Sequence, residues 1–291
     1  MLIASNNYRR LNKVQKIFLT YLCYRGNVSS SFFSTNSNRN RSDEKRVHVG
    51  VHALNICIIA GSTRTNGPPR PILSDRVTAF IQSSIANRDA GHEISILKAK
   101  DNIILPNEDG DDPNNPETST MPLLERPHFT YPESQMPDHL KKMHETLAKA
   151  DAYIAITPEY NHSPCPGLMN LMNHFGSSTF GFKPSAIVSY SAGQWGGTRA
   201  AHSLRPFLSE LGCLPVSAMV HIPNAANVLK DDGQLISMDI DEQERWSGYV
   251  DRLVSQVEWW GEAARSQRNV MDPYSASPAF RASPSQRNAP N

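Results

Sequence analysis

The segment Asn55-Ile56-Cys57-Ile58-Ile59-Ala60-Gly61-Ser62-Thr63-Arg64-Thr65-Asn66-Gly67 decides the fold class of this 291-residue chain. From Ile56 to Ala60 every side chain is apolar, and the run then stops in small and polar residues. A short apolar run with such an end is typical of a parallel strand that is buried on both faces. We therefore expect an α/β domain in which this strand leads into a polar loop.

A second run of the same kind is Asp151-Ala152-Tyr153-Ile154-Ala155-Ile156-Thr157-Pro158-Glu159-Tyr160-Asn161, which we interpret as a strand followed by a Pro-Glu-Tyr-Asn turn. In an open parallel sheet, ligands bind outside the carboxyl ends of strands, where the strand order reverses. Two polar segments at two such ends therefore predict one shared site. The first loop also predicts a phosphate on the ligand, because loop N–H groups, hydroxyls and a guanidinium favour an anion.

Strands and helices alternate from about Val47, which is the pattern of a doubly wound α/β domain. The predicted strands span 54–60, 94–97, 152–157, 186–190 and 216–221, and the predicted helices span about 74–87, 140–147, 167–175, 201–211 and 241–265. The last helix is expected to bury one side that carries Trp246, Val250, Leu253, Val257 and Trp260. This pattern predicts a flavodoxin-like three-layer sandwich with a five-stranded parallel sheet in the order 2-1-3-4-5.

Charge is distributed unevenly along the chain. Residues 1–42 carry seven basic side chains and no acidic one, which leaves the remainder with 22 basic and 28 acidic residues and a net charge of about −6. Such a body lacks the basic excess that nucleic-acid binding requires. No apolar run approaches the ~20 residues of a membrane helix. We therefore expect neither a nucleic-acid partner nor a membrane partner.

Three parts of the chain differ in composition. Residues 1–46 are rich in Arg, Ser and Asn, and we expect a disordered leader there, with the composition of a mitochondrial transit peptide. The alternatives are a disordered extension without a targeting role, or an upstream start that is never used, and the protein would then be cytoplasmic. Residues 47–268 are predicted to form the folded domain, and the Ser-, Pro- and Arg-rich segment 269–291 is predicted to be a disordered tail.

The cysteines and histidines do not form a metal-binding or catalytic motif. No CxxC or metal-ligand spacing occurs, and we name no catalytic acid or base. Cys57 and Cys213 lie in apolar runs, so we expect them to be buried. Cys165 neighbours the predicted site. Its thiol is either inert or reactive, and the sequence leaves both interpretations open.

A third segment, Ser189-Tyr190-Ser191-Ala192-Gly193-Gln194-Trp195-Gly196-Gly197-Thr198-Arg199, follows the fourth predicted strand. Its glycines expose main-chain N–H groups and allow a flat ligand to approach closely. It is not a hydrolase nucleophile elbow, because Ser189 stands where the first Gly of GxSxG must be. The first loop likewise lacks the Walker A and GxGxxG spacings, and an ordinary turn that caps a helix is its alternative interpretation.

In this order and at these intervals, the three segments resemble the NADPH-dependent FMN reductase family over about residues 55–265. The resemblance implies a noncovalently bound FMN that receives a hydride from NADPH or NADH and passes it to a small acceptor, such as a quinone, free flavin, azo compound or metal oxyanion. It also implies that Ser62 and Arg64 bind the FMN phosphate. The residues implied to border the isoalloxazine are Pro158, Glu159, Tyr160, Asn161, Ser191, Gly193, Trp195, Gly196 and Gly197.

The resemblance further implies a homodimer or homotetramer. The family's second segment commonly continues Pro-Gly-x-Leu-Lys-Asn-x-x-Asp, whereas Met169 and Asn173 replace the Lys and the Asp here, which puts the usual subunit contact in question. The alternative function is an FMN-binding electron carrier or a redox-responsive interaction protein. Dedicated carriers tend to be strongly acidic, so the mild net charge of the body favours an enzyme. A phosphate-binding enzyme without flavin would need a nucleophile or base that these loops do not offer.

Overall fold

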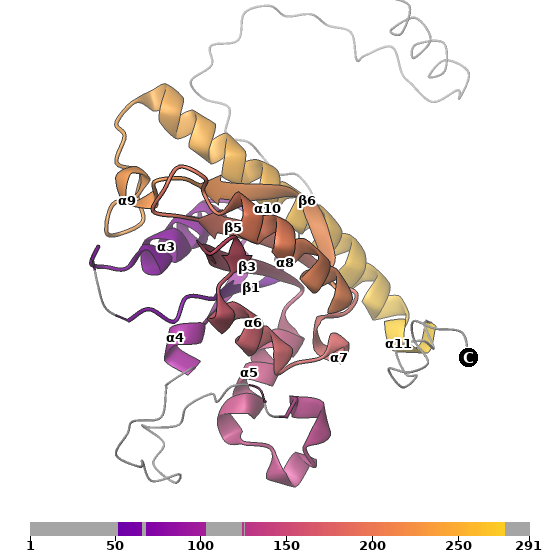
Figure 1. Ribbon diagram of the computed structural model, residues 1–291. Coiled ribbons are helices and arrows are strands. Elements are labelled where there is room, and N and C mark those ends of the chain that lie inside the picture. The colour runs from indigo at the N-terminus through magenta and orange to yellow at the C-terminus, as the bar shows by residue number, and fades with distance from the viewer. Residues whose placement is uncertain (1–51, 66–67, 103–123, 125, 277–291) are drawn as a thin grey trace, which may run out of the picture. The chain divides into compact units, whose positions relative to one another are not determined.

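The computed structural model describes residues 52–65, 68–102, 124 and 126–276 (Figure 1). Five parallel strands form the sheet: β1 (Asn55–Ala60), β2 (Glu93–Lys98), β3 (Ala152–Tyr160), β5 (Pro184–Tyr190) and β6 (Leu214–Ile222). Their order is β2-β1-β3-β5-β6, which confirms the predicted order 2-1-3-4-5 of the main strands. A two-residue strand, β4 (Ser163–Pro164), pairs antiparallel with the end of β3.

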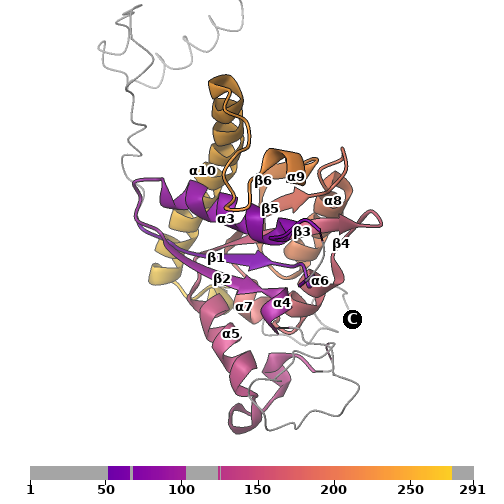
Figure 2. The same cartoon turned by 90° about the vertical axis from the view of Figure 1, so that its left-hand side faces the viewer.

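Helices cover both faces of the sheet and make the predicted three layers (Figures 1 and 2). One face packs against α3 (Leu73–Ala86) and α10 (Ile240–Val270). The other packs against α5 (Asp138–Lys149), α6 (Pro166–Asn173) and α8 (Thr198–Glu210). The shorter elements are α4 (Ala99–Asn102), η2 (His128–Thr130), η3 (Glu133–Gln135), α7 (Ser177–Phe180), α9 (Ala225–Val228) and α11 (Pro273–Ala276).

Strand β1 shows why strands of this sheet appear in the sequence as continuous apolar runs. Alternate side chains of a strand point to opposite faces of the sheet. Ile56 and Ile58 pack on the side of α3 and α10, whereas Cys57 and Ile59 pack on the side of α5 and α6. Both faces are buried, so both sets of side chains must be apolar. The predicted burial of Cys57 is confirmed, as is that of Cys213.

The interpretation of Pro158 to Asn161 as a turn is wrong. Strand β3 continues through Pro158, Glu159 and Tyr160, and the turn is made by Asn161 and His162, which connect β3 to β4. These two residues have φ angles of 50° and 65°. A two-residue hairpin connection requires left-handed conformations of this kind, which Asn adopts more readily than most residues.

The C-terminal helix is longer than predicted, and one of the two tryptophans expected on its buried side is exposed. Helix α10 extends to Val270 rather than ending near residue 265, and α11 follows at 273–276, within the segment predicted to be a disordered tail. Trp260 is 45% exposed, although the pattern placed it on the buried side. Residues 1–46 and 277–291 lie outside the described residues, so the domain limits remain a prediction.

The described residues contain neither a candidate membrane-spanning helix nor a candidate metal-binding cluster. None of their helices has the length and hydropathy needed to span a bilayer. No group of three or more His, Cys, Asp or Glu side chains within the described ranges is arranged to hold a metal ion.

Candidate functional site

The carboxyl ends of β1, β3 and β5 meet at one edge of the sheet. The N–H of Gly61 donates to the carbonyl oxygen of Ile156 at 2.9 Å, which ties the first loop to β3. Pro158 is the register partner of Tyr190, which ties β3 to β5. Tyr190 is buried, which raises the pKa of its hydroxyl, and the side chains of Ser74 and of Ser62 in the first loop partly offset that rise. The three segments named from the sequence therefore lie together.

The loop after β1 packs closely against the start of α6. A Cβ atom on Gly61 would lie 2.3 Å from the Cβ of Leu168, and one on Gly167 would lie 2.6 Å from the carbonyl oxygen of Gly61. Only glycines permit this close approach. The loop then continues through Ser62, whose buried hydroxyl accepts the N–H of Arg64 at 3.3 Å.

Beyond Ser62 the first loop is open to solvent. The side chains of Thr63, Arg64 and Thr65 are exposed. A guanidinium and two hydroxyls at the end of a strand are suited to binding an anion. The loop is therefore rigid where it touches α6 and accessible where its polar side chains lie.

Glu159 does not present a free carboxylate at the site. One carboxylate oxygen accepts the Nε–H of Arg199 at 2.8 Å, and the other accepts the backbone N–H groups of Arg199 and Ala200 at 3.1 and 3.4 Å. Burial pushes the pKa of Glu159 upward, but the hydrogen bonds from Arg199 and Ala200 outweigh it and hold the pKa below its ordinary value of 4.5. Glu159 thus caps the first turn of α8 and pairs with its first cation.

Two serines hold the glycine-rich loop in shape. The Ser191 hydroxyl accepts the N–H of Gly196 at 2.9 Å and donates to the carbonyl oxygen of Gly193 at 2.7 Å. The Ser189 hydroxyl donates to the carbonyl oxygen of Gly196 at 2.8 Å. Gly196 and Gly197 have φ angles of 61° and 79°, in the left-handed region that favours glycine.

Two residues of this loop are open to a ligand. The indole of Trp195 is 60% exposed, and the guanidinium carbon of Arg199 lies 5.4 Å from its ring centroid. Gly193 is exposed, and a Cβ atom there would have no neighbour within 4 Å. An aromatic face and an accessible backbone are therefore available on the same loop.

The environment of Cys165 favours the inert interpretation. Its side chain is buried, its N–H donates to the Thr157 hydroxyl at 3.0 Å, and its sulfur lies 3.5 Å from the same hydroxyl. Burial raises the pKa of the Cys165 thiol. A buried protonated thiol is a poor nucleophile.

Sequence reasoning placed Glu159 at the site but missed its partner Arg199, and it missed the roles of Tyr190 and His221. Arg199 follows a Gly-Gly pair at a helix start, but 40 residues separate it from Glu159 and no local spacing pairs them. His221 lies 2.7 Å from the Ser189 hydroxyl through its Nδ1 atom, and burial lowers its pKa. Only the alignment of β5 with β6 brings these two residues together.

Together, the fold and the site define a flavodoxin-like α/β protein with polar and glycine-rich loops at the carboxyl edge of its sheet. The model of the NADPH-dependent FMN reductase family matches residues 54–227, which is more than half of the chain. The chain belongs to this family of oxidoreductases, as the sequence segments predicted.

Several curated proteins are similar to part of the chain. It is 30% identical over 129 residues to a quinone reductase of Pseudomonas putida KT2440, which covers 42% of this chain and 66% of that protein. It is 34% identical over 104 residues to an NAD(P)H-dependent FMN reductase of Pseudomonas aeruginosa, which covers 34% of this chain and 56% of the relative. The chain thus spans between about half and two thirds of the length of these relatives.

A solved structure shares the fold. The flavoenzyme FerB, an NAD(P)H:(acceptor) oxidoreductase of Paracoccus denitrificans, superposes with a TM-score of 0.51 at 20% sequence identity. The superposition covers 71% of this chain and 98% of FerB. At this level of identity the likeness extends to the fold and not to the ligands.

Proposed function

We propose that this protein is an NAD(P)H-dependent oxidoreductase that binds FMN at the carboxyl edge of β1, β3 and β5. The observation that carries the proposal is the meeting of three loops there: Gly61 donates to Ile156 of β3, and Pro158 of β3 is the register partner of Tyr190 of β5. Membership of the NADPH-dependent FMN reductase family supports it. The acceptor would be a small molecule such as a quinone, a free flavin or an azo compound.

The chemistry of the donors fits a phosphate at the first loop. Arg64 supplies an exposed guanidinium, and Ser62 contributes a hydroxyl that already shapes the loop. A hydrogen bond to a charged group contributes about 1.5–3 kcal/mol. These two residues are therefore the proposed phosphate ligands.

The other two segments fit the planar end of the cofactor. Pro158, Glu159, Tyr160 and Asn161 would border the ring from β3, and the loop from Ser191 to Gly197 would border it from β5. The pairing of Glu159 with Arg199 matters here, because it neutralises a carboxylate that would otherwise repel an anionic cofactor. Trp195 offers the exposed aromatic face of this loop.

Bound FMN supplies the hydride chemistry, so the chain needs no acid or base for that step. The chain's own residues would orient the ring and would offer backbone N–H groups to negative charge that develops on it. The N–H of Gly196 already donates to Ser191, so Gly193 and Gly197 are the stronger candidates for this role. NADPH or NADH would be the co-substrate, and the active assembly would be a homodimer or homotetramer.

The experiment is to purify the full chain, reconstitute it with FMN and measure flavin absorbance per chain. We expect close to one flavin per chain, bleached anaerobically by NADPH and restored by a quinone. Failure to retain FMN would overturn the proposal. Rapid bleaching followed by slow reoxidation with every acceptor would instead favour an electron carrier or a redox-responsive interaction protein.

A further inference from the structure

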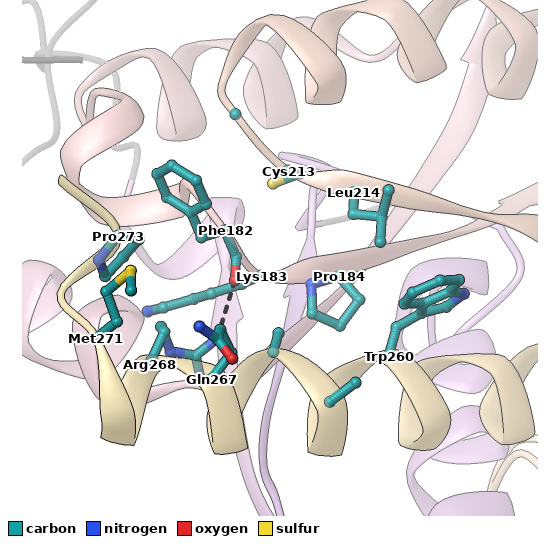
Figure 3. Close-up of a pocket in the computed structure, with 13 residues that line it drawn as sticks. Phe182, Lys183, Pro184, Cys213, Leu214, Trp260, Gln267, Arg268, Met271 and Pro273 are labelled. Atoms are coloured by element: carbon teal, nitrogen blue, oxygen red, sulfur yellow. Dashed lines mark hydrogen bonds between the residues drawn. The ribbon is translucent and has the colours of Figure 1, made fainter. Parts of the chain in front are cut away.

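A cavity of about 550 Å³ lies at the amino ends of β5 and β6, away from the proposed FMN site (Figure 3). Pro184, which lines the cavity, begins β5, whereas Tyr190 at the carboxyl edge ends it. Six residues of extended strand span about 20 Å. The cavity and the carboxyl-edge site are therefore separate.

The cavity exists because α10 continues past the region where it packs closely on the sheet. Val257 is fully buried, and Gly261 allows the helix to touch Leu54, where a Cβ atom would lie 2.7 Å from a Leu54 methyl group. In the following turns the residues that face the cavity include two small ones, Ala263 and Ala264. Small side chains at this point leave a space between the helix and the strand ends.

Polar contacts join the walls of this space. Arg268 of α10 donates to the carbonyl oxygen of Phe182 and to the carboxylate of Asp151, both at 2.9 Å. Figure 3 shows Arg268 reaching from the helix toward the strand side, with its bond to Phe182 drawn as a dashed line. These bonds therefore connect the helix to the strand side, and the space between them is not filled by apolar side chains.

One end of the cavity is closed by the chain beyond α10. Met271 and Pro273 line that end, and the next residue, Tyr274, places its hydroxyl 2.8 Å from the carbonyl oxygen of Ser178. The ring of Tyr274 also meets the ring of Phe182 edge to face at 5.6 Å. Phe182 has a φ angle of 60°, a strained conformation for a bulky residue that these contacts maintain.

The two cations that line the cavity, Lys183 and Arg268, already have hydrogen-bond acceptors within the protein. The Lys183 ammonium donates to the carbonyl oxygens of Ala148 and Leu147 at 2.8 and 3.2 Å and to the Tyr153 hydroxyl at 3.0 Å. Arg268 donates to Asp151 and to the carbonyl oxygen of Phe182, and no carboxylate is among the lining residues of the described chain. The cavity therefore favours a neutral ligand.

The apolar lining indicates what kind of neutral ligand fits. Trp260, Leu214 and Met271 line this one cavity and are 45%, 47% and 49% exposed. Large apolar side chains gathered around one hollow are typical of a binding site, and the volume lies within the range of small-molecule pockets. The Gln267 side chain adds an amide at the same wall. We infer that this cavity binds one small, neutral aromatic molecule, packed on Trp260 and Leu214 and hydrogen-bonded to Gln267.

The test uses the neutral fluorescent probe N-phenyl-1-naphthylamine with the full chain in the presence of saturating FMN, so that a carboxyl-edge site is filled. We expect saturable binding of one probe per chain. Ala264→Leu should fill the cavity and weaken binding at least tenfold. Asn269→Leu, which adds the same side chain at an exposed position of α10, should leave binding unchanged.

A second variant keeps the test decisive if Ala264→Leu does not fold. Trp260→Ala removes a half-exposed ring, so it should fold and also weaken binding at least tenfold. Circular dichroism and the thermal midpoint report the fold of each variant. Absence of saturable binding, or equal affinity in all variants, would overturn the inference. So would sedimentation showing that a second copy of the chain occupies this surface and that Ala264→Leu abolishes the association.

Discussion

The carboxylate of Glu159, at the end of β3, holds both the guanidinium and the backbone N–H of Arg199, at the start of α8. Arg199 in turn lies beside the ring of Trp195. One carboxylate thus caps a helix, neutralises a cation and fixes the neighbour of an exposed indole. This arrangement ties two of the three segments at the carboxyl edge to each other.

Glu159→Gln should reduce the free energy of unfolding by about 1.5–3 kcal/mol, the range for hydrogen bonds to a charged group. Glutamine keeps the size of the side chain but loses the charge and one acceptor oxygen. Urea unfolding at neutral pH measures the change. In a double-mutant cycle with Arg199→Ala, the two losses should not add, because both variants break the same contact; strictly additive losses would contradict the pairing.

The same contact predicts an acid dependence. The folded-state pKa of Glu159 lies below the ordinary value of 4.5, so its contribution is complete above pH 4.5 and is lost as the pH falls through the folded-state pKa. The stability difference between the parent protein and Glu159→Gln should therefore shrink in that acid range. A difference that stays constant from neutral pH down to pH 3 would rule this out.

Arg64→Ala should lower FMN affinity by about ten- to a hundredfold, since one charge-assisted hydrogen bond is worth about 1.5–3 kcal/mol. Quenching of flavin fluorescence measures the affinity. Arg252→Ala removes an exposed arginine on α10 and serves as the matched control. Equal FMN affinity in the two variants would show that Arg64 does not bind the phosphate.

Two neighbouring histidine rings predict a loss of stability below neutral pH. The rings of His128 and His144 lie 4.3 Å apart. Burial lowers the pKa of each, and the neighbouring His144 lowers that of His128 further. Because the unfolded chain, at the ordinary value of 6.5, takes up these protons first, the free energy of unfolding should fall as the pH drops below 6.5.

The variant that checks this is His144→Phe, which keeps an aromatic ring but removes the titrating group. Its unfolding free energy should vary less between pH 7 and pH 5 than that of the parent protein. Urea unfolding at several pH values gives both slopes, and identical slopes would show that the pair does not contribute.

Gly61→Ala should destabilise the protein by about 1–3 kcal/mol, the usual cost of overpacking. The new methyl group would lie 2.3 Å from the Cβ of Leu168 and 2.9 Å from the sulfur of Cys165. Gly248→Ala is the control, because a Cβ atom there meets nothing within 4 Å and lies inside α10. That change should stabilise the helix by roughly 0.5–1 kcal/mol, and thermal unfolding compares the two.

Much of the fold was predictable because β1 and β3 are buried on both faces. An apolar run of strand length that ends in polar residues has few other interpretations, and the alternation with helices then determines the layers. The bounds of β3 were less predictable. Pro158 and Glu159 resemble turn residues in the sequence, and only pairing with β4 and β5 shows that they extend the strand.

The remaining errors come from contacts between distant segments. The apolar periodicity of α10 includes Trp260, but periodicity does not indicate where the sheet beneath a helix ends. The pairing of Glu159 with Arg199 likewise depends on the neighbouring positions of β3 and α8, which the order of residues does not reveal. The structure brings the three predicted segments together at one edge of the sheet, and the bonds among them could be found only from the fold.

The position of the cavity and of the carboxyl-edge site at opposite ends of β5 has a practical consequence for protein engineering. Substitutions more than about 10 Å apart that share no partner have additive effects on free energy. The cavity can therefore be redesigned around Ala264 as a ligand-responsive module, while the loop at Arg64 is optimised in a separate library. The gains from the two libraries should combine in one chain without a further round of selection.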